Sequence, residues 1–327
     1  MAVMYIYTDL CEHFACGMCG SCCRNDWLIT VDEESYRRNA LLFGKTGREE
    51  EFGKAFVPIL NPNANCVGEY AYIAKQANGS CWFLNGDNRC RLQVEAGHGH
   101  LDAVCQTYPR YPINTTRGVE LTLSFSCPTV LKLAMRPQPL AIVRSEHAPL
   151  VFSLDSCVAA VYPRQQPPSD PLRYYFELEH HFIDILQCRG LTIEERLGLI
   201  ETTVSGLLKI GRSDGINQGL DMIIHNNYTI MDSKSEAAGQ WCACPTDMLT
   251  DILVEHFFVN FIFKKPFYLY GLERTAKLLR HMWGRFQARG KKESDRLGDM
   301  ERICSVITAI EFEYGHNRKA LLMPDNF

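Results

Sequence analysis

Four cysteines lie within eight residues near the start of the chain, and they constrain its fold more than any other feature. Cys16, Cys19, Cys22 and Cys23 have the spacing C-x2-C-x2-C-C, with a glycine in each of the two gaps. Glycine supplies the positive φ that a tight turn needs, so neighbouring thiolates can converge on one centre. The stretch therefore predicts a zinc site or an iron–sulfur cluster.

The fifteen cysteines of the chain are concentrated in its first part. The N-terminus has no basic region followed by a long apolar run, so we expect no secretory signal and a cytoplasmic location. Disulfides are rare in that compartment, and clustered cysteines there indicate metal ligands. The candidate ligands are the opening four and the single cysteines that follow, namely Cys16, Cys19, Cys22, Cys23, Cys81, Cys90, Cys105 and Cys127.

Composition excludes several classes of partner. The net charge of −4 implies no bulk attraction to nucleic acid or to an anionic membrane. The most apolar stretch, residues 248–270, contains Asp251, Glu255 and Pro266 and is interrupted by two lysines. Because a bilayer span needs about 20 nearly uncharged residues, we interpret this stretch as a buried helix followed by a break. We expect neither a nucleic-acid nor a membrane partner.

A turn in the first part of the chain is predicted to bring two cysteines together. Asn85-Gly86 is a strong hairpin signal, with Cys81 on one arm and Cys90 on the other. Around it we expect a helix beginning at Asp32, a helix over 94–105, a strand over 118–126 and a helix from Pro128 to about residue 135.

The later part of the chain has helical periodicity. Thr192-Ile-Glu-Glu195 matches a capping box. The spacing of apolar residues predicts helices over 172–186, 192–210, 216–226, 246–263, 269–289 and 294–314, with a polar loop over 232–245. Prolines crowd residues 136–171. We therefore predict an α+β fold with a cysteine-rich module (1–136), a proline-rich connection (137–171) and a mainly helical domain (172–327).

The identity of the metal stays open between two alternatives. Zinc prefers four tetrahedral ligands, usually from two C-x2-C pairs, whereas the later cysteines here stand singly. A [4Fe–4S] cluster presents four irons to four thiolates at wider separation, which suits this mixture of near and distant ligands. Of the adjacent pair Cys22-Cys23, one would ligate the main centre and the other would pack or serve a second site. The spacing does not select four of the eight candidates.

Other polar residues have both a functional and a plain structural interpretation. Arg110 could bind a carboxylate bidentately, or form a surface salt bridge. His98 and His100 fit a solvated loop better than a ligand pair. Cys242-Ala-Cys244 is a C-x-C without a partner pair nearby, which favours coincidence.

Two further groups lie on predicted helices. Glu179, His180 and His181 could form a polar constellation, although the sequence alone favours a plain helix face. A basic run over 274–292 is typical of the wet side of a helix and could also bind an acidic partner.

Several enzyme signatures are absent. The chain has no G-x-G-x-x-G after a strand, no P-loop and no G-x-S-x-G elbow. The C-x3-C-x2-C motif of radical enzymes that use S-adenosylmethionine (SAM) is missing as well, because Asp26 occupies the position of the third cysteine.

The cysteine pattern resembles a known family. Cys16-x2-Cys19-x2-Cys22-Cys23 is similar to the cluster of the CxxCxxCC family of zinc- or iron-chelating domains. The segments Cys81-Trp-Phe-Leu, Asn88-Arg-Cys90, Cys105-x2-Tyr-Pro-Arg110 and Leu123-Ser-Phe-Ser-Cys127-Pro128 resemble its flagellin lysine N-methylase branch, and so does Val259-Asn-Phe-Ile-Phe-Lys-Lys265. The resemblance implies SAM-dependent methylation of a lysine side-chain amine, on flagellin or on a small lysine-containing substrate, with an iron–sulfur cluster near the active site.

A lysine amine is protonated at neutral pH, so an N-methylase must desolvate it or offer a base. Tyr108, Arg110 and Tyr111 are the candidate catalytic residues, with Asp26 and Glu120 as further polar groups. Two alternatives to an enzyme are kept. One is a non-catalytic zinc- or iron-binding or metal-delivery protein, and the other is an interaction module in which the metal only stabilises the fold.

Overall fold

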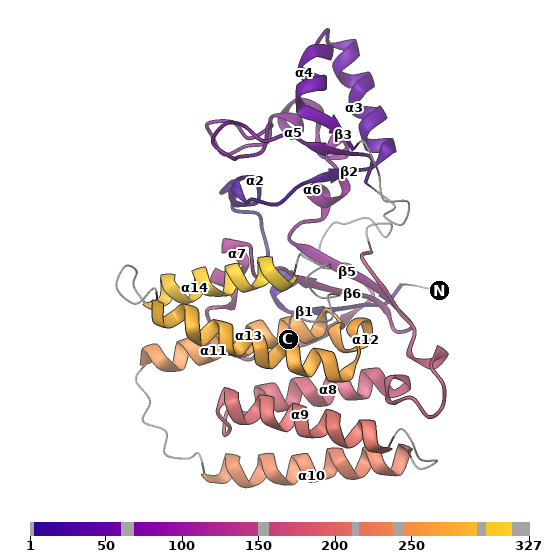
Figure 1. The fold of residues 1–327 in the computed structure, drawn as a ribbon, viewed down its shortest axis with the longest axis vertical. Helices are drawn as coiled ribbons and strands as arrows, with labels where there is room; N and C mark the ends of the chain where they lie inside the picture. Colours follow the sequence, from indigo (N-terminus) through magenta and orange to yellow (C-terminus); the bar gives the residue numbers. More distant parts are fainter. Residues whose placement is uncertain are drawn as a thin grey trace. The chain divides into compact units, whose positions relative to one another are not determined.

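The computed structural model describes residues 3–59, 69–149, 157–210, 216–237, 245–292 and 299–315, which form two compact units (Figure 1). One, the cysteine unit, spans Ala15–Pro109. The other, the helical unit, combines the described residues up to Phe14 with those from Arg110 onward. Helices and two small sheets occur in the part of the chain that the structure describes, which agrees with the predicted α+β class.

This division differs from the predicted boundaries at residues 136 and 171. Strands from residues 110–123 pair with a strand near the N-terminus, so they group with the helical unit. The proline-rich stretch supplies both edge strands of the same sheet. It is therefore part of the helical unit, because its backbone N–H and C=O groups are satisfied by that sheet.

The cysteine unit is built on a three-stranded antiparallel sheet of order β2-β4-β3. As predicted, Asp32 begins a helix: its Oδ1 accepts a hydrogen bond from the Ser35 backbone N–H at 2.7 Å. The elements of the unit are α2 (Ser21–Arg24), β2 (Thr30–Val31), α3 (Glu33–Lys45), α4 (Glu49–Ala55), β3 (Phe56–Pro58), β4 (Ala71–Ile73), α5 (Arg91–Ala96), a 3₁₀ turn (His98–His100) and α6 (Ala103–Thr107).

The core of this unit joins aromatic rings to cysteine thiols. Phe43, Phe56 and Phe83 are almost fully buried, and the rings of Phe56 and Phe83 lie 5.4 Å apart. Cys81 belongs to the same core, and Cys23, Cys90 and Cys105 are among the side chains packed around it. The apolar core thus holds residues from several segments that carry candidate ligands.

Two local predictions in the cysteine unit are corrected. The helix expected over 94–105 is interrupted, because Gly97 adopts φ +85° between α5 and the 3₁₀ turn. The hairpin arms are single bridges, Lys75 to Cys81 and Leu84 to Cys90, instead of strands. The turn itself is confirmed by the hydrogen bond from the Asn85 backbone N–H to the Arg89 carbonyl, at 2.9 Å.

The helical unit contains a five-stranded mixed sheet of order β7-β1-β6-β5-β8. Its strands are β1 (Tyr5–Thr8), β5 (Arg110–Thr115), β6 (Gly118–Leu123), β7 (Ile142–Ser145) and β8 (Ala160–Val161). β6 lies parallel to β1 and antiparallel to β5. Its residues from Val119 to Leu123 are all buried. The sequence predicted this strand, and its polar residues Glu120 and Thr122 are buried together with the apolar ones because both faces of the strand are covered.

The other described elements of this unit are helices and short helical turns. They are α1 (Leu10–His13), α7 (Pro128–Ala134), α8 (Tyr175–Gln187), α9 (Ile193–Ile210), α10 (Ile216–Ala237), α11 (Pro245–Phe263), α12 (Pro266–Tyr270), α13 (Leu272–Lys292) and α14 (Asp299–Ile310), with a π-turn over Glu311–Gly315 and two short 3₁₀ turns. Figure 1 shows α8, α9 and α10 side by side. α11 is buried from Ile252 to Phe263 and packs on β6, as its continuous apolar sequence predicts.

Most predicted helices of this unit are confirmed, with changes at their ends. The capping box is present: the Glu195 backbone N–H donates to Thr192 Oγ1, and the Thr192 N–H donates to Glu195 Oε2. The helix expected over 269–289 is divided at Gly271, whose φ is +89°. α10 continues through Ala237, into the stretch predicted as a loop. Cys242 and Cys244 lie outside the described residues.

The search for membrane spans was limited to the described residues. Among them, no helix combines the length and the apolar character that crossing a bilayer requires.

Candidate functional site

Of the four opening cysteines, Cys16 and Cys19 lie on a turn and Cys22 and Cys23 lie in α2, which follows it. Gly20, just before this helix, has φ +71°, in the left-handed region. A Cβ at this position would lie 2.9 Å from Arg24 Nη1 and 3.3 Å from Leu84 Cδ1. Glycine is therefore needed here both for its backbone conformation and for the close approach of the turn to the hairpin.

Three thiols form a contact chain beside this turn. The Sγ atoms of Cys22 and Cys23 are 3.9 Å apart, and the Cys81 backbone N–H donates to the Cys23 carbonyl at 2.7 Å. The Cys23 thiol hydrogen-bonds both neighbours, which raises its own pKa and lowers the pKa of Cys22 and of Cys81 to about 7. Of these three thiols, Cys22 and Cys81 are thus the more readily ionised, and the thiolate is the form that binds metals.

Cys90 and Cys105 complete a group of four from four different segments. Burial raises the pKa of Cys90, and the charges of Cys81 and Cys22 raise it further. Burial also raises the pKa of Cys105, as do Asp102 and the thiols at 81, 90 and 22. Every pair among Cys22, Cys81, Cys90 and Cys105 therefore interacts electrostatically. We call these four residues the thiol cluster.

Besides the thiol cluster and Cys23, three candidate ligands remain. Cys16 and Cys19 are exposed on the opening turn, where Cys16 Sγ accepts from the Met18 backbone N–H at 3.4 Å and Cys19 lies 3.2 Å from Ser21 Oγ. Cys127 belongs to the helical unit and is the N-cap residue of α7. No disulfide links the cysteines that the structure describes.

The donor set of the cysteine unit fits an iron–sulfur cluster. Cluster irons take thiolate ligands, and four thiols from separate segments meet that need. As placed among the described residues, no three Cys, His, Asp or Glu side chains are close enough to bind one metal ion together. A cluster spaces its thiolates more widely than a single ion does, so this separation is compatible with it.

Two buried donors in the same unit support this fit. Trp82 Nε1 and Asn25 Nδ2 are both buried and have no hydrogen-bond acceptor among the described residues. Trp82 packs on the core that holds Cys81. Buried N–H groups are nearly always paired, and cluster sulfurs accept such hydrogen bonds.

The three candidate catalytic residues fall on both sides of the unit boundary. Tyr108, in the cysteine unit, packs edge-on against Trp27 at 5.0 Å, and Trp27 Nε1 donates to the Cys22 carbonyl at 2.8 Å. Arg110 and Tyr111 begin β5 in the helical unit. There Arg110 lies over the Phe14 ring, and Lys264 Nζ lies 5.3 Å from the centre of the Tyr111 ring. Tyr108 is thus linked through Trp27 to Cys22 of the thiol cluster.

The helical unit contains a buried network of four charged side chains. Two of them, Glu120 and Glu179, are carboxylates that the sequence analysis named as candidates. Lys265 Nζ lies 2.7 Å from Glu120 Oε2 and 2.5 Å from Glu179 Oε1, and Arg117 bridges the same two carboxylates. Burial disfavours ionisation of Glu120, but Lys265 and Arg117 outweigh it and lower its pKa, whereas burial raises the pKa of Glu179. The sequence did not single out the two cations, Lys265 and Arg117, as members of a network. Lys265 directly precedes Pro266, so in the sequence it resembles an ordinary lysine at the end of a helix.

A second buried polar group lies nearby in the same unit. Glu311, in the π-turn, accepts from Ser124 Oγ at 2.8 Å and pairs with Lys264. His181 is separate from the Glu179 network, since its Nε2 meets Asn227 Nδ2 at 2.8 Å. His180 is exposed. The predicted constellation of three residues is therefore divided between a charge network, a neutral hydrogen bond and solvent.

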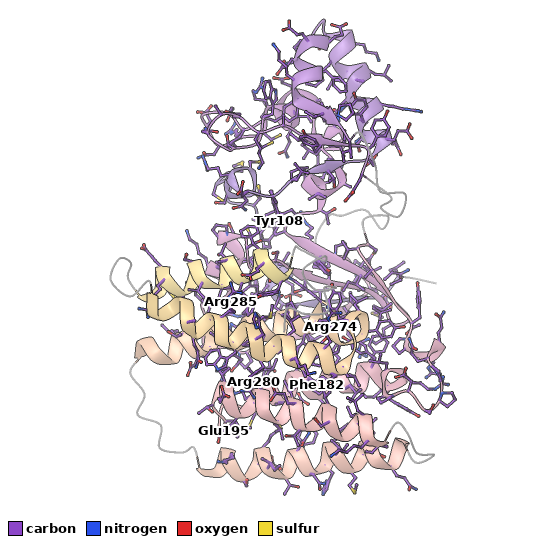
Figure 2. All side chains as sticks on the ribbon, viewed as in Figure 1. Tyr108, Phe182, Glu195, Arg274, Arg280 and Arg285 are labelled. Carbon is purple, nitrogen blue, oxygen red and sulfur yellow. The ribbon has the colours of Figure 1, made fainter. Side chains whose placement is uncertain are left out.

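The basic run on α13 is largely paired with acidic residues. Figure 2 shows Arg274, Arg280 and Arg285 along this helix. Arg280 pairs with Glu194 and Glu201, and Arg285 pairs with Glu313. This pairing favours the interpretation as the wet side of a helix. The side chains from 289 to 292 lie outside the described part.

Comparison with known proteins gives consistent matches. Over 158 residues the chain is 28% identical to a protein named lysine-N-methylase from Salmonella choleraesuis, covering 47% of this chain and 37% of that protein. A protein of the same name from Salmonella typhimurium is 27% identical over 157 residues, with the same coverage. The chain is related to the lysine N-methylases. This confirms the resemblance found in the sequence.

The extent of these matches is limited. They span little more than a third of the length of the two methylases. Flagellar biosynthetic protein FliU of Salmonella muenchen is 28% identical over 120 residues, which cover 36% of this chain and 69% of that protein. No family model and no solved structure matches the chain. The similarity to the wider CxxCxxCC family thus rests on the quoted cysteines alone.

Proposed function

We propose that this chain is a lysine N-methyltransferase that uses SAM and carries a [4Fe–4S] cluster. The observation that carries the proposal is the match to proteins named lysine-N-methylase. The substrate would be the side-chain amine of a lysine in a flagellar protein such as flagellin, as the name of the FliU relative suggests, or in a small molecule. Reduced thiols and SAM are both available in the cytoplasm, where we expect the reaction.

The thiol cluster would hold the iron–sulfur group. Cys22, Cys81, Cys90 and Cys105 come from four segments of the unit, and each pair of them contributes to a pKa shift of at least one member. Cys23 would then have the second role expected for one member of the adjacent pair, since it hydrogen-bonds Cys22 and Cys81. When bound, the iron–sulfur cluster would supply a redox-active iron centre in the cysteine unit.

The chain itself must remove a proton from the lysine amine, whose ordinary pKa is about 10.4. Among the three candidate catalytic residues, Tyr108 has described contacts that lead through Trp27 to Cys22. A tyrosine hydroxyl can accept or donate a proton in such a step. We therefore propose Tyr108 as the first residue to test for this role.

Methyl transfer from labelled SAM tests the proposed function. Protein purified without oxygen is incubated with SAM carrying a labelled methyl group and with flagellin or free lysine, and methyl-lysine is measured by mass spectrometry. We expect label on the side-chain nitrogen. The Cys90→Ala variant should lose both iron and activity. The control variant Cys304→Ala, which changes a cysteine of the helical unit, should keep both. If fully loaded protein yields no methyl-lysine from either substrate, the proposed activity is wrong.

A zinc-binding protein without catalytic activity is the second candidate, and one distance favours it. With Zn–S bonds of about 2.3 Å, tetrahedral thiolates lie roughly 3.8 Å apart, and the Sγ atoms of Cys22 and Cys23 are 3.9 Å apart. Metal and sulfide analysis separates the two candidates. Stoichiometric zinc in a colourless protein supports the second, whereas iron with equimolar sulfide in a brown protein supports the first.

A further inference from the structure

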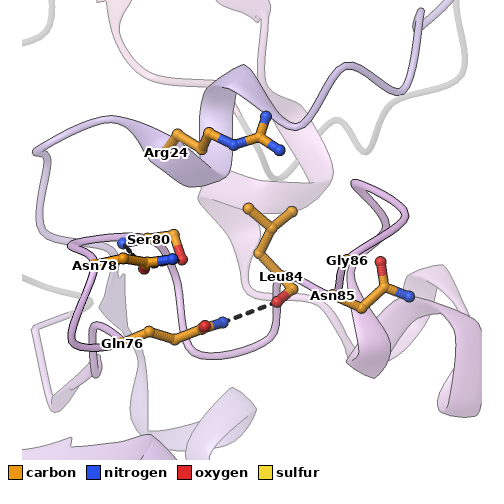
Figure 3. A pocket seen from close by; sticks show the side chains of 7 residues that line it. All are labelled: Arg24, Gln76, Asn78, Ser80, Leu84, Asn85 and Gly86. Carbon is orange, nitrogen blue, oxygen red and sulfur yellow. Dashed lines mark hydrogen bonds between the residues drawn. The ribbon is translucent and has the colours of Figure 1, made fainter.

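A polar pocket of about 420 Å³ lies in the cysteine unit (Figure 3). It is lined by Arg24, Gln76, Asn78, Ser80, Leu84, Asn85 and Gly86. Its volume is within the range of small-molecule sites. Arg24 directly follows Cys23, and Ser80 directly precedes Cys81, so the pocket wall is continuous in sequence with the thiols. Nothing in the function proposed so far uses this pocket.

The two asparagines of the pocket have fixed orientations. Asn78 Oδ1 accepts hydrogen bonds from the backbone N–H and the hydroxyl of Ser80, at 3.0 and 2.7 Å. Asn85 Oδ1 accepts from the backbone N–H groups of Asp87 and Arg89, at 3.0 and 2.8 Å. A backbone N–H can only donate, so these contacts identify the oxygen of each amide. The amide nitrogens remain as donors for a ligand.

Arg24 adds a positive charge to these donors. Its Nη1 donates to the Cys19 carbonyl at 2.8 Å, and its Nη2 donates to Asn88 Oδ1, which hold the guanidinium in place. None of the seven lining residues is acidic. A guanidinium together with amide N–H groups is the arrangement that binds a carboxylate.

Gln76 provides the opposite polarity. Its Nε2 donates to the carbonyl of Leu84 at 2.8 Å (Figure 3). The same nitrogen donates to the carbonyls of Cys81, at 2.9 Å, and of Trp82. These contacts identify the nitrogen, so Oε1 is the atom left to accept a hydrogen bond. An ammonium group is a donor without acceptor capacity and suits this oxygen.

We infer that this pocket binds the free α-amino-acid end of a small molecule, with its carboxylate on Arg24 and its ammonium on Gln76. This inference rests on the proposed function, under which two ligands carry such a group: the methionine end of SAM, and free lysine. A lysine within a protein chain has neither a free α-carboxylate nor a free α-ammonium. For a protein substrate, the ligand of the pocket is therefore SAM.

Binding of matched ligand pairs tests the inference without requiring turnover. Affinities are measured by calorimetry on the full chain, which carries its iron–sulfur cluster and is kept from oxygen. SAM is paired with 5′-methylthioadenosine, which lacks the amino-acid end, and lysine is paired with pentylamine, which lacks the carboxylate and the α-amine. The variants are Arg24→Gln, Arg24→Lys and the control Arg37→Gln, which removes an exposed arginine of the same unit. Iron content and circular dichroism confirm that each variant is folded.

We expect Arg24→Gln to weaken SAM binding at least about tenfold, because a charge-assisted contact to a carboxylate is lost. Arg24→Lys should recover part of the affinity. 5′-Methylthioadenosine should bind all variants equally, and Arg37→Gln should bind both ligands like the parent. A loss confined to lysine, with pentylamine unaffected, would support the amino-acid site and assign it to the substrate.

Two results would overturn the inference: unchanged affinity of Arg24→Gln for both SAM and lysine, or equal losses for the ligands with and without the amino-acid end. Neither depends on methyl transfer. A protein that binds SAM through Arg24 but makes no methyl-lysine would refute the proposed function alone.

Discussion

Cys22 and Cys23 are neighbours in the chain, but the pKa of Cys22 is lowered and the pKa of Cys23 is raised. Cys23 is hydrogen-bonded to both Cys22 and Cys81, and these contacts raise the pKa of Cys23 and lower the pKa of Cys22 and of Cys81 to about 7. The motif alone treats the two residues as equivalent. Their hydrogen bonds, which depend on Cys81 from the hairpin, make Cys22 the better thiolate.

Substitution of single cysteines tests the thiol cluster. Cys81→Ala, Cys90→Ala and Cys105→Ala should each remove most of the iron, the sulfide and the visible absorption, because each deletes one of four ligands. Cys16→Ala and Cys304→Ala should retain them. Iron and sulfide analysis with optical spectra provides the measurement. Loss of the cluster in Cys16→Ala would show that the exposed opening turn contributes a ligand and that the four-thiol set is wrong.

A second residue-scale prediction concerns Lys265, whose side chain is fully buried. Lys265→Met should lower the free energy of unfolding by roughly 3–5 kcal/mol, because it leaves Glu120 and Glu179 buried with one cation fewer. Lys277→Met removes an exposed pair with Glu273 and should change stability by less than about 1 kcal/mol. Urea denaturation measures both. Equal effects would mean that the buried network adds nothing beyond a surface pair.

At the scale of elements, the pairing of β1 with β6 depends on one glycine. Gly118 has φ +131°, and a Cβ there would lie 2.1 Å from the Met4 carbonyl oxygen. That oxygen accepts a hydrogen bond from the Val119 N–H at 2.9 Å. The contact holds the start of β6 against the parallel strand β1, so a side chain at residue 118 would separate the two strands.

Replacing either of two glycines by alanine should therefore change the stability of the protein in opposite directions. Gly118→Ala should destabilise the protein by roughly 2–4 kcal/mol through steric overlap and backbone strain. Gly284→Ala lies within α13 with no atom near the added Cβ, and should stabilise the protein by about 0.5–1 kcal/mol. Thermal unfolding of the two variants gives the comparison. A neutral Gly118→Ala would mean that β1 and β6 are not held at this distance.

At the scale of the whole molecule, buried neutral histidines link stability to pH. Burial lowers the pKa of His181 to about 4, opposed by Asp184 and assisted by His180. Burial also lowers the pKa of His256, although its hydrogen bond to the Ala134 carbonyl opposes the shift. Between pH 6.5 and 4 the unfolded chain binds more protons at these positions than the folded chain, so stability falls with the pH.

Replacing one histidine should remove part of this dependence. For His181 alone, the free energy of unfolding should fall by about 2 kcal/mol from pH 7 to pH 5. His181→Gln should lose this part of the slope, and the exposed His147→Gln should retain it. Urea denaturation at the two pH values measures the difference. Identical slopes in all three proteins would show that His181 is accessible to protons in the folded state.

Sequence by itself determined the features that depend on residues close together in the chain. The capping box at Thr192, the proline at the first position of α7 and the turn at Asn85-Gly86 were all predicted and are present. Each is decided by interactions within a few residues, which the local sequence contains. The buried helix before Lys264 was equally readable, because apolar residues on every side of a helix require burial.

Only the tertiary structure decided which residues share an environment. Cys16 and Cys22 belong to one motif, yet Cys16 is exposed while Cys22 interacts with thiols 59, 68 and 83 residues later. Likewise, Lys265 is paired with Glu120 and Glu179 from distant segments. Such groupings arise because pairing of strands and burial of apolar surface bring separate segments together. Spacing along the chain does not encode that proximity. It therefore identified eight cysteines as candidate metal ligands but did not show which of them lie together.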